Sequence, residues 1–346
     1  MLKDRDQFVD IMRGIAMLLV VLGHTMTGCT VGAERSFLFN IVWSLQMPLF
    51  ILISGYVTRY SRDIDSSATL LKYVKVRTKS YLLPWAVWSF LVRGIIFSQH
   101  NFLDIKWNLW HMDSGYWFLI TIWTINIIFG VSCFVARKIA KEPGIKRQIA
   151  TLAVYIFGMA ILTGIGLVAG LSFFSIKLTL YYMPFYFAGY LYGQYADKIS
   201  EAKWGKTAID ATVAVCLAVW LLVMTRYDLY ALPDRGMGII LRVVSSMAGC
   251  TVVCGLCKNI FCYVSDKKAQ IATSTCWCGE HSLEIYLTHY LLLNLLKMME
   301  MPITGSIQGA ALIAINFLIT VGMTTFTVKI LSTNRILRLI LFATKV

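Results

Sequence analysis

Two side chains that could take part in chemistry lie in the first long apolar segment of this 346-residue chain. Arg13 and His24 are eleven positions apart, so on an α-helix they would lie within about 20° of each other and about 16 Å apart along the axis. A guanidinium offers a fork of donors that suits phosphate groups, and an imidazole takes up and releases a proton near neutral pH. The spacing fits a site in which Arg13 binds a phosphate-bearing molecule and His24 acts as a general base on a hydroxyl.

The same residues have a simpler interpretation. Arg13 at the end of an apolar helix is equally a charged anchor at the membrane surface, and His24 is equally a packed histidine that hydrogen-bonds another helix. Asp10 lies one turn before Arg13 and is placed to pair with it, which also makes it a candidate for binding substrate. Spacing alone does not decide between the two interpretations.

A second polar set opens an apolar segment near residue 281. His289 lies eight positions after His281, about 12 Å along a helix, at a depth similar to that of His24. Tyr286 and His289 share one helix face. His289 is therefore a second candidate catalytic residue, and Tyr286 is a candidate for binding substrate. A helix with one interhelical hydrogen bond would explain the same pattern.

A short basic segment precedes another apolar stretch. Lys72, Lys75, Arg77 and Lys79 are four cations within eight residues. Such a segment beside a membrane commonly binds lipid headgroups. With Arg13 on the same side of the membrane, Lys75, Arg77 and Lys79 are alternatively candidates for binding a pyrophosphate.

The cysteines raise the question of a metal site. Cys254 and Cys257, followed by Cys276 and Cys278, are spaced roughly as in a zinc knuckle. The second pair has only one intervening residue, however, and the first pair continues a stripe of small apolar residues on one helix. We therefore expect no metal. Because the nine cysteines lie mostly in apolar runs, we expect no disulfide framework either.

The elements that position these residues are predicted to be membrane helices. Hydrophobic residues make up 58% of the chain and charged residues 14%, with a mean hydropathy of +0.68, whereas soluble domains are about one quarter charged. This composition excludes an ordinary soluble enzyme and a disordered chain. A transmembrane helix needs about 20 mostly apolar residues. By that rule we predict an all-α, polytopic membrane protein with ten spans, at 13–30, 37–57, 80–98, 115–136, 148–169, 175–195, 207–225, 237–257, 281–297 and 307–331.

The distribution of charge predicts the orientation. About three quarters of the 32 Lys and Arg residues fall in segments that are cytoplasmic if the N-terminus is inside. Cytoplasmic loops collect Lys and Arg, so we expect both termini in the cytoplasm. The net charge of +14 then reflects the loops, and no nucleic-acid partner is expected.

Several segments resemble the acyltransferase 3 family of integral-membrane O-acyltransferases, and within it the short stand-alone forms related to fucose 4-O-acetylase. The pattern of Arg13, ten residues and His24 within VDIMRGIAMLLVVLGH is similar to the family's signature. Further similar segments follow in the family's order and span nearly the whole chain. They are QMPLFILISGY (46–56), VRTKSYLLPW (76–85), YWFL (116–119), YYMPFYFAGYLYG (181–193) and HSLEIYLTH (281–289).

The resemblance implies a single membrane acyltransferase domain over residues 1–346, without an appended SGNH domain, in the bacterial inner membrane. It implies acetyl-CoA as the acyl donor, reaching the site from the cytoplasm, and a glycan or lipid-linked sugar as the acceptor. Arg13 would hold the phosphates of the donor and His24 would deprotonate the acceptor. Further residues match recurrent family positions, namely His289, Tyr286, Arg77 and Trp117, the last a candidate for binding substrate.

Two functions from different classes follow. The main prediction is an enzyme that transfers an O-acetyl group from acetyl-CoA to a polysaccharide or its lipid-linked precursor. The alternative is a transporter or flippase that moves a sugar, lipid or small acid without chemistry. Transporters favour internal repeats with broken helices at matching positions, and Pro48, Pro84 and Pro184 are not symmetrically placed, which favours the enzyme. The expected partners are the acceptor and membrane lipids; the sequence leaves open whether the chain forms a homo-oligomer.

Overall fold

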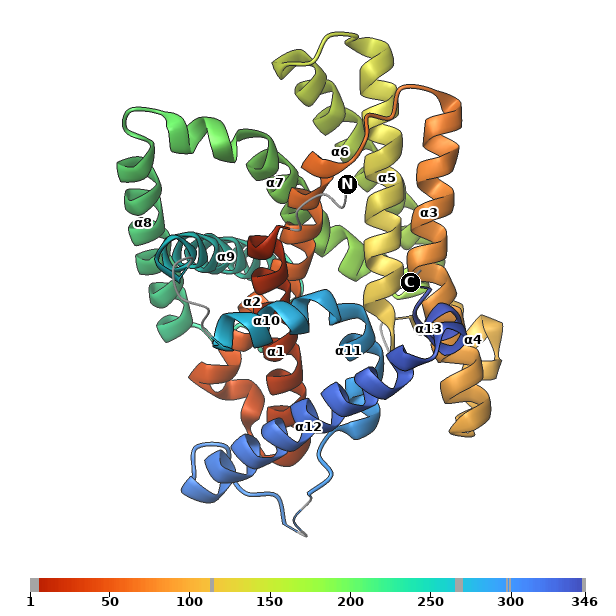
Figure 1. Cartoon of the computed structure of the whole chain (residues 1–346), viewed down its shortest axis with the longest axis vertical. Coiled ribbons are helices and arrows are strands. Elements are labelled where there is room, and N and C mark those ends of the chain that lie inside the picture. Colours follow the sequence, from red (N-terminus) through yellow and green to blue (C-terminus); the bar gives the residue numbers. More distant parts are fainter. Residues whose placement is uncertain (1–5, 113–114, 265–269, 297, 299, 344–346) are drawn as a thin grey trace. The chain divides into compact units, whose positions relative to one another are not determined.

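The computed structural model describes residues 6–112, 115–264, 270–296, 298 and 300–343 (Figure 1). Within these ranges the chain is helical, and β-structure is limited to one isolated bridge between Val31 and Ile303. The chain divides into two compact units. The first comprises Met1–Arg59 and Ala188–Ile330, and the second comprises Tyr60–Phe187 and Leu331–Val346.

The first unit contains the helices that carry the predicted histidines. A long buried stripe on α1, which includes Met12, Ala16 and Met17, packs against α2, α9 and α10. The elements of this unit are α1 (Gln7–Cys29), η1 (Ala33–Arg35), α2 (Phe37–Tyr56), η2 (Val57–Tyr60), the second half of α7 (Ile176–Glu201), α8 (Gly205–Arg226), α9 (Met237–Val264), α10 (Gln270–Glu280), α11 (Ser282–Thr288), η6 (His289–Leu292) and α12 (Ile307–Thr333).

Helix α1 meets α10 at backbone distance. A β-carbon added at Gly14 would lie 2.1 Å from the carbonyl oxygen of Thr275, and one added at Gly279 would lie 1.8 Å from that of Asp10. No side chain fits in these spaces, so glycine is what allows the two helices to approach so closely. The chain then bends at His281, which separates α10 from α11.

The second unit contains the basic segment. Trp88 contacts the C-terminal helix of this unit. The indole Nε1 of Trp88 donates to the carbonyl oxygen of Leu341 at 2.9 Å, and the ring stacks on Phe342. Its elements are α3 (Ser67–Ala86), the π-helical segment η3 (Val87–Ile96), η4 (His100–Leu103), α4 (Ile105–Trp110), α5 (Trp117–Ile139), α6 (Ile145–Ala169), η5 (Phe173–Ser175), the first half of α7 and α13 (Arg335–Phe342).

Seven helices in the described part of the chain are long and apolar enough to cross a membrane. They are Gln7–Cys29, Phe37–Tyr60, Trp117–Ile139, Ile145–Ala169, Gly205–Arg226, Met237–Lys258 and Ile307–Thr333. Each coincides with one of the ten predicted spans. The all-helical membrane fold is thus confirmed, and ten spans with cytoplasmic termini stay a prediction.

The other three predicted spans are not among these seven long apolar helices. The segment 175–195 lies in the helix α7, and 80–98 is helical as far as Ile96, with a change to π geometry after Pro84, which lacks an amide donor. The prediction of one helix over 281–297 is wrong. Among the described residues of this segment, helical structure ends at Leu292, because Leu293 is extended and Asn294 has a left-handed φ of 52°.

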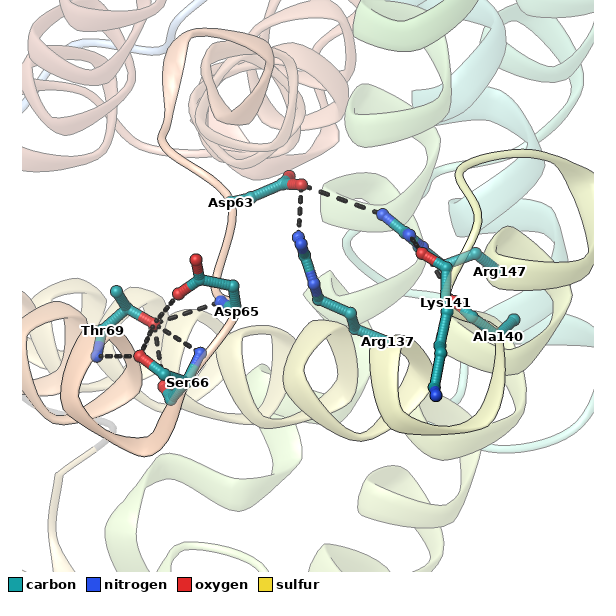
Figure 2. Close-up of polar contacts among 8 residues, drawn as sticks. All are labelled: Asp63, Asp65, Ser66, Thr69, Arg137, Ala140, Lys141 and Arg147. Atoms are coloured by element: carbon teal, nitrogen blue, oxygen red, sulfur yellow. Dashed lines mark hydrogen bonds and ion pairs between the residues drawn. The ribbon is translucent and has the colours of Figure 1, made fainter.

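A polar network fixes the start of α3 (Figure 2). Ser66 caps the helix by accepting from the Thr69 amide at 3.2 Å, and the Thr69 hydroxyl accepts from the Ser66 amide at 2.9 Å. Nearby, Asp63 accepts from Arg137 at 2.6 Å and lies 3.8 Å from Arg147. These contacts join the loop before α3 to α5 and α6.

The same network affects a carboxyl group outside the membrane spans. Hydrogen bonds from the side chains of Thr69 and then Ser66 lower the pKa of Asp65. Because the folded-state pKa is the lower one, the stabilisation is complete above the unfolded value near 3.9. It is lost as the pH falls through the lowered value.

The cap should matter more than the ion pair. We expect Ser66→Ala to lower the free energy of unfolding by about 1 kcal/mol, because the Thr69 amide in the first turn of α3 loses its acceptor. Asp63→Asn should cost less, under about 1 kcal/mol, since the Asp63 side chain is 74% exposed. Thermal unfolding in detergent compares the two variants, and a larger loss from Asp63→Asn would contradict this ranking.

Candidate functional site

The first candidate site is built on α1. This helix runs unbroken from Gln7 to Cys29, so Arg13 and His24 have the predicted separation of about 16 Å along one helix. Asp10 is buried at 3% exposure, Arg13 is half-buried and His24 is exposed. The side chain of His24 is therefore only partly covered by the first unit.

His24 lies against two rings from the segment after α11. Its ring centroid is 5.5 Å from that of His289 and 5.8 Å from that of Tyr290, which meets it edge-on at 88°. Tyr286 lies on the His289 side of this group, with ring centroids 6.1 Å apart. The structure thus brings together His24, His289 and Tyr286, three of the candidate residues, and adds Tyr290, which the sequence reasoning missed.

The orientation of His289 is set by its own helix. Its side chain is buried at 2% exposure, and Nδ1 lies 3.0 Å from the carbonyl oxygen of Ile285. Because a carbonyl only accepts, Nδ1 carries the proton, and Nε2 of the neutral ring presents a lone pair. Among the described residues this Nε2 has no hydrogen-bond partner. The simple interpretation, an interhelical hydrogen bond, is not what the described structure shows.

Two further unsatisfied oxygens lie beside α1. Gln46 on α2 approaches Gly23, where an added β-carbon would be 2.9 Å from Oε1, and the Asn294 amide group contacts Gly28. Oε1 of Gln46 and Oδ1 of Asn294 are buried and have no partner in the described part of the chain. Buried polar atoms are normally paired, so these oxygens are suited to accepting from a ligand. The sequence signals were the segment QMPLFILISGY, which begins at Gln46, and the two glycines near His24.

A second candidate site, in the other unit, surrounds Arg77 on α3. The guanidinium carbon lies 5.0 Å from the ring centroid of Tyr73, and Nε is buried without a partner among the described residues. Asn126 organises the ring of Tyr73, because its Oδ1 accepts from Tyr73 at 3.0 Å and from Tyr186 at 3.1 Å. The Asn126 amide nitrogen donates to the carbonyl oxygen of Ile122 at 2.7 Å. Arg77 is thus held in a preorganised polar cluster.

The remaining predicted residues are placed differently. Lys75 and Lys79 are exposed on a different face of α3 from Arg77, so the structure does not gather the three cations at one point. Trp117, the first residue of α5, stacks on buried Tyr182 with ring centroids 5.7 Å apart and an angle of 14°. Of the four cations of the basic segment, Arg77 alone joins the polar cluster just described.

These features define a multi-pass helical membrane protein with an exposed imidazole next to a buried one. The acyltransferase 3 family, described as an acyltransferase domain, matches residues 6–331, and the chain therefore belongs to this family. Among characterised proteins, the nodulation protein NolL of Mesorhizobium japonicum is 30% identical over 140 residues. The match covers 37% of this chain and only about a third, 35%, of that protein. No solved structure matches the chain significantly.

The unsatisfied oxygen of Gln46 gives a prediction that separates stability from activity. Gln46→Met keeps the shape of the side chain and removes a buried acceptor, so thermal stability should be unchanged or higher. If the oxygen accepts from substrate, activity should fall about two- to tenfold. Asn40 on the same helix is the control, because its amide bonds Tyr227 and Leu229. Asn40→Leu should destabilise the protein; a Gln46→Met variant that is equally destabilised would contradict the prediction.

Proposed function

We propose that the chain is an O-acetyltransferase of the bacterial inner membrane, with both termini in the cytoplasm. It moves an acetyl group from cytoplasmic acetyl-CoA to a hydroxyl of a cell-surface polysaccharide or its lipid-linked precursor. The observation that carries this proposal is the pairing of exposed His24 with buried His289. The Nε2 atom of His289 has a lone pair and no hydrogen-bond partner among the described residues.

In the proposed reaction His24 acts as the general base. It removes the proton from the acceptor hydroxyl while that oxygen attacks the carbonyl carbon of the thioester. The ester C–O bond forms, the C–S bond breaks, and His24 passes the proton to the departing thiolate of coenzyme A. His289 then has a positioning role, because its Nε2 can accept a hydrogen bond from the imidazolium that forms on His24.

The other residues are assigned to the two substrates. Arg13 would bind phosphates of the donor, and Asp10, one turn before it, would contribute to the same end of the site. Tyr286, next to His289, would contact the acceptor. Arg77 is also proposed as a residue that binds donor phosphates, which is supported by its Nε, buried without a partner among the described residues. Lys75 and Lys79, the two other predicted donor contacts, would attract the donor electrostatically. Trp117, a predicted substrate contact, would pack against the acceptor.

Mass spectrometry of surface glycans and lipid-linked sugars tests the function. Cells that lack the protein should lose one acetyl mass, which the unmodified protein restores and His24→Ala does not. With purified protein, His24→Ala should lower kcat by at least about 100-fold. His289→Gln, which retains an acceptor oxygen, should keep more activity than His289→Leu.

Two results would reject the proposal. One is an unchanged acetylation pattern in the deletion strain together with no binding of acetyl-CoA to the purified protein. The other is full complementation by His24→Ala at matched expression. In either case the transporter or flippase would become the better interpretation.

The donor contacts are distinguished by kinetics. Arg77→Lys keeps the charge but loses the planar fork of donors, so we expect a rise in KM for acetyl-CoA of about tenfold with a smaller change in kcat. The control is Tyr73→Phe, which keeps the ring beneath Arg77 and loses the bond to Asn126. An unchanged KM in Arg77→Lys at normal stability would remove Arg77 from the donor site.

A further inference from the structure

An apolar cavity of about 280 Å³ lies within the first unit, among α2, α7, α8 and α9. Aliphatic and small side chains form most of its wall, including Leu52, Ala188, Ile209, Val213 and Met247. A bound water needs two to four polar partners, and this wall offers few. A hydrocarbon chain matches the chemistry of the lining.

One end of the cavity lies near the ends of three helices. Its wall includes Ile199 near the end of α7, Ala208 near the start of α8, and Lys258 near the end of α9. Trp204, in the connection between α7 and α8, is 71% exposed and has the ammonium of Lys203 6.0 Å from its ring. Exposed Trp and Lys concentrate at the level of lipid headgroups, which places this end of the cavity at that level.

The ammonium group of Lys258 lies at the same end of the cavity. Lys258 is the last residue of the apolar span Met237–Lys258, and its ammonium lies 5.0 Å from the ring centroid of Tyr192. The nearby carboxylate of Asp197 is already engaged by Arg59, which donates to it from two nitrogens. Asp6 also interacts electrostatically with Lys258, so these four ionised groups together carry no net charge. The ammonium of Lys258 is the charged group that lines the apolar cavity.

We propose that this cavity binds one acyl chain of an anionic phospholipid, with the lipid phosphate at Lys258. The apolar wall takes the chain, and the ammonium pairs with the phosphate at the interface, where each basic residue favours anionic lipid. None of the residues in this cavity belongs to the histidine site or the Arg77 cluster. The lipid site is therefore independent of the proposed acetyl transfer.

Native mass spectrometry of the full-length protein tests the proposal, with palmitoyl-oleoyl phosphatidylglycerol and phosphatidylcholine as competing probes. The unmodified protein should retain phosphatidylglycerol preferentially. Lys258→Gln should lower that preference about fivefold, and Ala208→Phe, which fills the cavity from an exposed position, should reduce retention of both lipids. Lys146→Gln, at an exposed lysine at the start of α6, should leave both unchanged.

Thermal unfolding of each variant checks that it is folded before its lipids are compared. Equal retention of the two lipids by the unmodified protein would overturn the proposal. So would a Lys146→Gln variant that loses as much phosphatidylglycerol as Lys258→Gln. If an isoprenyl phosphate displaces phosphatidylglycerol at equal concentration, the cavity belongs to a lipid-linked substrate and the assignment to phospholipid is wrong.

Discussion

The histidine site depends on how closely the segment after residue 270 approaches α1. Gly14 and Gly279 remove the side chains that would hold α10 away from α1. After the bend at His281, His289 contacts His24 and Asn294 contacts Gly28. Contacts on both sides of the bend thus fix the separation of the two imidazoles. A larger residue at either glycine would move the whole segment, and with it the ring of His289.

Unpaired polar side chains inside a protein lower its stability, because each unpaired buried polar atom costs about 1–3 kcal/mol. Apolar residues in place of Gln46, His289 and Asn294 would fill the same space equally well. These three side chains lie against the same few turns of α1 that carry Gly23, His24 and Gly28. In a membrane protein, ionisable and polar residues of this kind usually line a pathway or a site. A ligand that supplies the missing donors would explain this cost.

Much of the fold was predictable because apolar length is a local property of the sequence. The seven apolar helices follow from runs of about 20 residues, and the stripe from Arg13 to His24 follows from helix geometry alone. The break at Asn294 was not predictable in this way. It depends on a left-handed backbone that an Asn adopts at low cost, and on contacts with α1 that lie far away in sequence.

Among the site residues, too, some follow from local sequence spacing and others depend on contacts that are distant in sequence. Sequence spacing identified the face shared by Tyr286 and His289, but it could not show that Tyr290 turns toward His24, because that contact depends on the end of α11. Gln46 was visible as part of a motif without a role. Its role is suggested only by the unpaired oxygen next to Gly23.

The basic segment shows why a count of charges does not define an anion site. Lys75 and Lys79 are one turn apart on an exposed face, where water and salt screen their charges. Arg77 lies two positions from each, on a face where Tyr73 and the Asn126 cluster replace water. A charge–charge interaction gains strength as the local dielectric constant falls, and a guanidinium loses less hydration than an ammonium. An anion therefore gains more from the one partly buried arginine than from either solvated lysine, although all three carry the same charge.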